Sequence, residues 1–180
     1  MKNKILIGAA ALMLAAMSVP ASETINNNSN VPLDFYRGGE LSVDAFGTMS
    51  AGRYTIDHLS SARVRHNARL GAGVGLNYFF TRNIGIGGDA YSEDNKGAFI
   101  DSASANLIVR FPLGQGGLAP YIYGGGGHQW DMGRVWFAQV GAGLEYRFTP
   151  HVGAFVDARW VLPDQAKYYG VARMGLRFAF

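Results

Sequence analysis

From Glu40 to the last residue, apolar side chains recur at every second position, and this alternation restricts the fold more than any other feature. In residues 168–180, the large apolar side chains fall on one face of an extended strand, whereas Arg173 and Arg177 fall on the other. Glycines obscure which face is apolar in residues 118–127. The alternation predicts a strand in each of eight segments: 40–46, 70–80, 84–91, 102–111, 118–127, 135–148, 152–162 and 168–180.

An internal repeat supports this count of strands. Residues 73–90 and 141–158 align without a gap and share the pattern Leu-x-Tyr-x-Phe-Thr. Keeping the apolar faces in phase requires a three-residue turn in each copy, at 81–83 and 149–151. A third short connection spans 112–117. The connections at the opposite end are longer, which predicts an up-and-down meander: they are 49–68, 92–97, 128–134 and 163–167.

The first 22 residues have the pattern of a secretory signal peptide. Lys2 and Lys4 precede an apolar run over residues 5–17, and small residues follow it. We expect a polar periplasmic lead-in at 23–39 and a barrel at 40–180. Without Lys2 and Lys4, the 16 Lys and Arg residues fall to 14 against 13 Asp and Glu, so charge gives no reason to expect nucleic acid as a partner.

Two kinds of closed barrel fit the meander. A soluble, lipocalin-like barrel turns its apolar face inward around a ligand, whereas a membrane barrel turns it toward lipid. The polar face here is mainly glycine with isolated charges, which suits an interior that has room only for its own side chains.

The aromatic residues favour the membrane barrel. Tyr78, Tyr146 and Phe148 lie at the short-turn end of the apolar face, and Trp136 and Trp160 lie toward the long loops, as in two aromatic girdles. The apolar segments run for about nine to eleven residues, the length that a tilted strand needs to cross a bilayer. The sequence therefore predicts an all-β fold, an eight-stranded antiparallel up-and-down transmembrane β-barrel whose last strand pairs with the first.

The signal peptide, the C-terminal Leu-x-Phe-x-Phe and the stretch "PYIYGGGG…VGAGLEYRFTPHVGAFVDARW" resemble the small outer-membrane β-barrel family, which includes OmpA-like transmembrane domains and opacity-type surface antigens. The resemblance implies a Gram-negative type outer membrane, with lipid and lipopolysaccharide around a monomer. It also implies that Phe180 serves as the signal read by the outer-membrane assembly machinery.

The polar face predicts a charge network inside the barrel. Asp157 is expected to face Gly143 across its hairpin, which leaves space for an arginine of the last strand. We expect paired charges that plug the lumen rather than a narrow ion path, because eight strands leave little room. The network comprises Glu145, Arg147, Asp157, Arg159, Arg173, Arg177, Asp89 and Arg110, with Glu40 and Asp44 beside them.

The loop predicted at 49–68 is basic. Arg53, Arg63 and Arg65, with Arg69 just beyond, make it a candidate contact for lipopolysaccharide phosphates or an acidic surface ligand. The alternative is an ordinary solvated loop at the level of the lipid headgroups.

His128 is the one candidate for catalysis, together with Ser92 and Glu93 from another loop, as in a lipid A-modifying enzyme. Nothing in the spacing of His58, His66 and His128 indicates a metal site. We expect no catalytic residue, cofactor or metal. The predicted function is a non-enzymatic surface protein that supports envelope integrity or contacts a surface ligand through its loops; the alternatives are a lipid A-modifying enzyme and a small channel.

Overall fold

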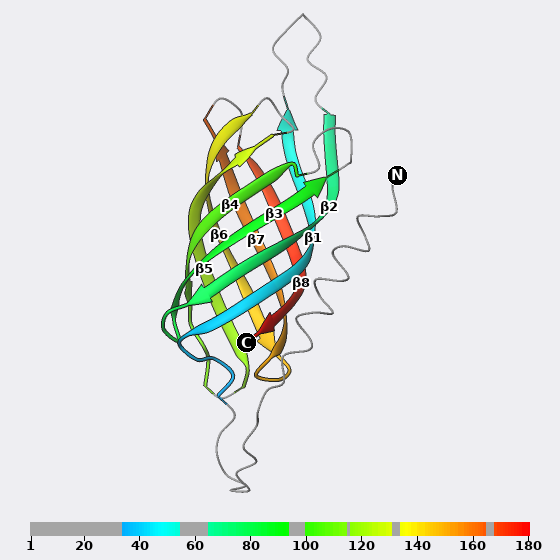
Figure 1. Cartoon of the computed structure of the whole chain (residues 1–180). Coiled ribbons are helices and arrows are strands. Elements are labelled where there is room, and N and C mark those ends of the chain that lie inside the picture. The colour runs from blue at the N-terminus through cyan, green and yellow to red at the C-terminus, as the bar shows by residue number, and fades with distance from the viewer. Residues whose placement is uncertain (1–33, 55–64, 94–99, 115, 131–133, 165–167) are drawn as a thin grey trace, which may run out of the picture. The chain divides into compact units, whose positions relative to one another are not determined.

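A computed structural model describes residues 34–54, 65–93, 100–114, 116–130, 134–164 and 168–180; for 52–54 and 65–68 it describes the backbone only. The predicted signal peptide and most of the predicted lead-in lie outside these residues. The barrel predicted from the sequence is confirmed, because eight antiparallel strands close into a barrel in chain order (Figure 1). The strands are β1 (Glu40–Tyr54), β2 (Arg65–Phe79), β3 (Ile84–Glu93), β4 (Ser102–Arg110), β5 (Leu118–Gln129), β6 (Val135–Arg147), β7 (Val152–Pro163) and β8 (Tyr169–Ala179). In the described part of the chain, no helix has the length and apolar character needed to cross a membrane.

The barrel closes between its first and last strands, as predicted. β1 and β8 pair from Ser42 opposite Ala179 to Ala51 opposite Gly170. The backbone N–H of Phe180 donates to the carbonyl of Leu41 at 2.8 Å, so the terminal residue is part of the sheet. The C-terminus therefore lies beside the start of β1 (Figure 1).

The two predicted three-residue turns have the same local structure. The hydroxyl oxygen of Thr81 accepts hydrogen bonds from the backbone N–H groups of Asn83 (3.2 Å) and Ile84 (3.0 Å). Thr149 does the same with His151 (3.3 Å) and Val152 (3.0 Å). A threonine at this position satisfies the backbone of a tight turn, which explains why the repeat keeps it. We call this end of the barrel, which also holds the C-terminus, the turn end, and the opposite end the loop end.

The β1–β2 hairpin differs from the prediction. The loop predicted at 49–68 is too long, because β1 continues to Tyr54 and β2 begins at Arg65. These extensions pair from Met49 opposite Leu70 to Tyr54 opposite Arg65. Their sequence lacks regular apolar alternation. A strand that continues beyond the lipid has no apolar surface to match, so alternation does not reveal it.

The apolar face points outward around the whole barrel. Trp136 and Met174 are 70% and 69% exposed, whereas Arg110 and Glu145 are fully buried. In β5, whose orientation the glycines obscured, tyrosines point inward and Ile122 points outward. A surface of exposed Leu, Val, Ile and Met around a charged interior is the reverse of a water-soluble barrel and suits a lipid surrounding.

Glycines make the crowded interior possible. A Cβ atom at Gly141 would lie 2.5 Å from the Tyr123 ring, and one at Gly143 would lie 2.7 Å from the Tyr121 ring. The rings of β5 thus cross directly over the backbone of β6. Each glycine leaves the space that an aromatic side chain of the neighbouring strand occupies.

Candidate functional site

At the turn end of the lumen, two arginines hold one carboxylate. Arg110 of β4 and Arg147 of β6 donate to the same oxygen of Glu40, at 2.8 and 2.6 Å. Arg147 also donates to the second oxygen at 2.8 Å. The three side chains are almost fully buried. This cluster connects strands that are far apart in the sheet across the interior.

Arg177 of β8 extends the network toward the middle of the barrel. Its Nε and Nη2 atoms donate to the two oxygens of Asp44, each at 2.7 Å, and its Nη1 donates to Glu145. Arg147 donates to the other oxygen of Glu145 at 2.7 Å. Such bidentate contacts give a guanidinium and a carboxylate a fixed relative orientation.

The predicted lead-in ends in residues 34–39, which close the mouth of the barrel at the turn end. The Tyr36 ring is only 2% exposed and lies 4.8 Å from the guanidinium carbon of Arg110 and 4.6 Å from that of Arg147. Its hydroxyl donates to the carbonyl of Gly117 at 2.7 Å. Burial raises the pKa of Tyr36 above its ordinary value, so the hydroxyl stays protonated and remains a donor.

At mid-height, Asp157 lies opposite Gly143, and Arg173 of β8 occupies the space beside it, as the sequence predicted. Arg173 donates to both oxygens of Asp157 at 2.9 Å. The hydroxyls of Tyr121 and Tyr123 donate to the same two oxygens at 2.7 and 2.9 Å. Four donors therefore satisfy this buried carboxylate.

Asp89 of β3 completes the network. It pairs with Arg159 at 3.0 Å and with Arg173 at 3.2 Å, and the hydroxyl of Ser104 donates to it at 2.9 Å. The Nε and Nη2 atoms of Arg159 are buried without a hydrogen-bond partner among the described residues, and its guanidinium lies over the Tyr91 ring at 5.1 Å. Buried donors of this kind usually bind ordered water, so we expect hydration at this level of the lumen.

The loop end of the lumen is closed differently. Phe137, Val161, Tyr169 and Val171 form a buried apolar cluster from β6, β7 and β8. The hydroxyl of Tyr169 donates to Gln129 at 3.0 Å, a neutral hydrogen bond. This end also holds the buried carboxylate of Glu93, to which the hydroxyls of Thr48 and Ser50 donate. The loop end thus combines an apolar cluster with hydrogen-bonded polar groups, whereas ion pairs dominate at the turn end.

A network of ion pairs joins five carboxylates and five arginines of the described lumen, and each has at least one partner. All eight side chains of the predicted network are among them: the ten are Glu40, Asp44, Asp89, Glu145, Asp157, Arg110, Arg147, Arg159, Arg173 and Arg177. The charges of these ten side chains sum to zero, and each buried charge has the partner that an interior requires.

Comparison with known proteins identifies the family of this barrel. The family described as "Outer membrane protein beta-barrel domain" matches residues 7–165. The chain belongs to that family. Outer-membrane barrels of this kind place short turns in the periplasm and long loops outside the cell, so the turn end is periplasmic and the loop end is extracellular.

Several solved structures share the fold. The N-terminal β-barrel domain of Pseudomonas aeruginosa OprF is 21% identical, with a TM-score of 0.61 over 80% of this chain and 99% of that one. Neisserial surface protein A is 16% identical, with a TM-score of 0.59 over 79% and 98%. Ail, the attachment invasion locus protein of Yersinia pestis, is 16% identical, with a TM-score of 0.51 over 79% and 99%, and has also been solved with the heparin analogue sucrose octasulfate. No curated relative matches the chain.

The structure of this outer-membrane barrel describes the candidate phosphate-binding arginines only in part. Arg53 and Arg65 lie in the paired extensions of β1 and β2, where only the backbone is described, and Arg63 lies outside the described residues. Arg69 lies within β2 on the row that faces the lumen, and its positive charge attracts the buried carboxylate of Glu93. The structure therefore places Arg69 away from the lipid headgroups.

The three residues considered for catalysis do not meet. His128 lies on the outward row of β5 between Trp130 and Trp136, with ring centroids 4.8 and 5.0 Å away. Glu93 faces the lumen, where the hydroxyls of Thr48 and Ser50 of β1 donate to its carboxylate. Ser92 donates to Asp101 at 3.3 Å. The histidine and the carboxylate therefore lie on opposite sides of the barrel wall.

A metal site receives no support from the described residues. No three His, Asp or Glu side chains gather there as possible ligands. His58 lies outside the described residues, and only the backbone of His66 is described.

Sequence reasoning missed two parts of the site. Tyr36 was missed because it follows a polar segment, and the one available signal was the aromatic pair Phe35-Tyr36 just before the first strand. The apolar cluster at the loop end was missed because Phe137, Val161 and Val171 occupy the row that the sequence reading assigned to glycine and charge.

Proposed function

We propose that this protein is a non-enzymatic outer-membrane protein whose closed, rigid barrel supports the envelope and presents its extracellular loops to anionic saccharides. The observation that carries the proposal is the network of ten ion-paired side chains in the lumen. An interior filled by mutually bound side chains gives a stiff support and no ready path for ions.

The alternative function, a narrow ion path, has little structural basis. The arginines that would line it are held by carboxylates on facing strands, with Arg177 bound on both sides by Asp44 and Glu145. Tyr36 covers the periplasmic mouth, and an apolar cluster occupies the extracellular end. A conducting state would require several of these contacts to break together.

The loops are the part of the barrel that can contact molecules outside the cell. The ends of β1 and β2 and the connection between them carry Arg53, Arg65 and Arg63, against the single acid Asp57. Arginine binds phosphate and sulfate oxygens in bidentate fashion, which makes lipopolysaccharide phosphates or a sulfated host polymer suitable ligands. The structure of Ail with a heparin analogue gives a precedent for such a ligand on a barrel of this size.

Binding of anionic saccharides tests this proposal directly. The variant Arg53→Gln/Arg63→Gln/Arg65→Gln should lose salt-sensitive binding to immobilised heparin and to lipopolysaccharide vesicles. The control is Arg37→Gln/Arg82→Gln, which removes two exposed arginines from the periplasmic end and should bind like the unaltered protein. Equal binding by all three proteins would contradict a role for the β1–β2 connection.

Two further measurements separate the alternative functions. The purified protein in planar bilayers should give no single-channel steps, and steps would favour the channel. His128→Ala should leave the acylation of lipid A unchanged in mass spectra of whole cells. A shift in lipid A mass that depends on His128 would favour the enzyme.

A further inference from the structure

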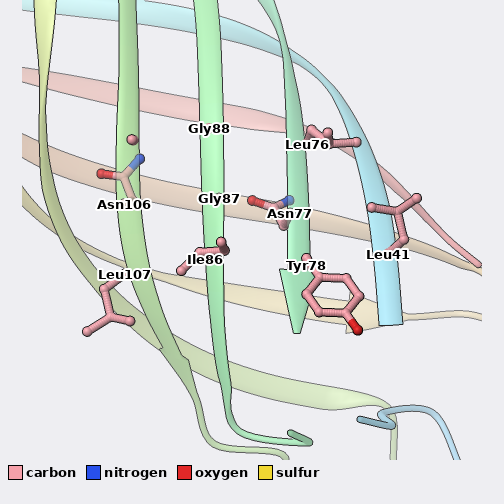
Figure 2. A pocket seen from close by; sticks show the side chains of 10 residues that line it. Leu41, Leu76, Asn77, Tyr78, Ile86, Gly87, Gly88, Asn106 and Leu107 are labelled. Atoms are coloured by element: carbon pink, nitrogen blue, oxygen red, sulfur yellow. The ribbon is translucent and has the colours of Figure 1, made fainter. Parts of the chain in front are cut away.

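The outer surface of the barrel is hollowed over β1 to β4. The hollow has a volume of about 550 Å³, and large apolar side chains surround it (Figure 2). Leu41, Leu76, Tyr78, Ile86 and Leu107 form its walls, and each is 40–56% exposed. We call this feature the β3 groove.

Gly88 of β3 creates the floor of the β3 groove, whereas Gly87 beside it faces the lumen. Gly88 belongs to the outward row and lies between Leu76 of β2 and Ala105 of β4, so the floor has no large side chain. Gly87 belongs to the inward row, where a Cβ atom would lie 2.2 Å from the amide oxygen of Asn77. The glycine at 87 is thus required by the lumen, but the glycine at 88 is not. A Cβ atom at Gly88 would meet only the carbonyl of Ser104, at an ordinary 3.4 Å.

The position of the β3 groove assigns it to one leaflet. Tyr78 and Ile86 are paired across the hairpin that ends in the turn 81–83, so the groove lies in the periplasmic half of the apolar band. Tyr78 also packs edge-on against Phe80, at 5.2 Å between ring centroids, within the periplasmic aromatic girdle. The Tyr78 hydroxyl is therefore at the level where headgroups begin.

We propose that the β3 groove binds one acyl chain of a phospholipid in the periplasmic leaflet, with the Tyr78 hydroxyl toward its headgroup. Four of the five wall side chains are aliphatic, and the groove opens into hydrocarbon, so the ligand that fits is a flexible apolar chain. This site adds to the proposed role of the loops and does not depend on it, since it lies at the other end of the barrel.

A second copy of the chain is the less suitable occupant. A two-fold dimer centred here would set hollow against hollow, because both copies contribute the same surface. A stable interface also needs close packing over about 800 Å² of each partner. An acyl chain can fill the groove without a complementary protein surface and without a large contact area.

Photocrosslinking in vesicles tests the proposal. The protein is reconstituted in phosphatidylethanolamine that carries a diazirine on one acyl chain, and crosslinked peptides are mapped by mass spectrometry. Crosslinks should be enriched at residues 76–78, 86–88 and 105–107 relative to residues 138–144 on the opposite wall. Even labelling around the barrel would overturn the proposal.

Variants that fill the groove sharpen the test. Gly88→Phe and Ala105→Leu should abolish the excess of crosslinks, whereas Gly47→Phe on the outward row of β1 should keep it. Gly47 is a matched control, because a Cβ atom there lies 3.8 Å from its nearest neighbour, the carbonyl of Gly71, and its strand partners Ala72 and Met174 lie outside the groove. Heat-dependent gel mobility establishes that each variant is folded. Unchanged crosslinking in both groove variants, or crosslinked protein dimers in place of lipid adducts, would contradict an acyl-chain site.

Discussion

The two ends of the lumen are filled by different chemistry. At the periplasmic end, Glu40, Glu145 and Arg177 belong to a network of ion pairs covered by Tyr36. At the extracellular end, Phe137, Val161, Tyr169 and Val171 pack as an apolar cluster. An ion pair requires a particular partner on a particular strand, whereas an apolar cluster requires mainly volume. The comparison indicates that register around the barrel is specified mostly at the periplasmic end.

The largest effect is expected from breaking the network at its centre. Arg177→Met leaves Asp44 and Glu145 without the arginine that joins them, and an unpaired buried charge costs about 3–5 kcal/mol. The free energy of unfolding, measured by urea titration in phospholipid vesicles, should fall by about this amount. The control is Met174→Leu on the same strand, which changes a lipid-facing side chain and should shift stability by less than about 0.5 kcal/mol. Equal stability of the two variants would show that the charges are not coupled.

A smaller effect is expected in the apolar cluster. Val161→Ala removes two methyl groups from a side chain that is 1% exposed, which should cost about 1.5–2.5 kcal/mol, independent of salt. Val156→Ala is the matched control on the same strand, because Val156 is 52% exposed toward lipid and acyl chains fill the space left there. If Val156→Ala destabilises the protein as much as Val161→Ala in the same urea titration, the extracellular lumen is not tightly packed.

The smallest effect is expected at the cover of the periplasmic mouth. Tyr36→Phe keeps the ring between Arg110 and Arg147 but removes the donor to the carbonyl of Gly117, which should cost about 0.5–1.5 kcal/mol. Tyr168→Phe, an exposed tyrosine at the opposite end, is the control and should be neutral. A destabilisation by Tyr36→Phe as large as that of Arg177→Met would mean that the cover, rather than the network, dominates.

Most of the fold could be predicted because lipid imposes a strict pattern on every strand that it contacts. The alternation around Trp136 and Leu144 indicated which face is apolar, and the repeat fixed the turns after Phe80 and Phe148. The pairing of Asp157 with an arginine followed from the glycine opposite it. The extensions of β1 and β2 lie beyond the lipid, so no such pattern marked them.

The interior contacts were less predictable. Alternation indicates which residues of each strand face the lumen, but it does not indicate which of them meet across the lumen. Arg159 reaches Asp89 from β7 to β3, and Arg110 reaches Glu40 from β4 to β1. These partners depend on the tilt and stagger of the closed barrel, which alternation does not determine. The role of Phe180 as an assembly signal stays a prediction, although its pairing with Leu41 is confirmed.

Fluorescence quenching of the tryptophans tests the central claim, that the apolar face contacts lipid. All three tryptophans, Trp130, Trp136 and Trp160, are on the outer surface, at 41%, 70% and 56% exposure. In vesicles whose acyl chains are brominated near the headgroup, most of the emission should be quenched, and iodide in the water should quench little. Strong quenching by iodide with none by brominated lipid would mean that this face contacts water and that the barrel is not embedded as described.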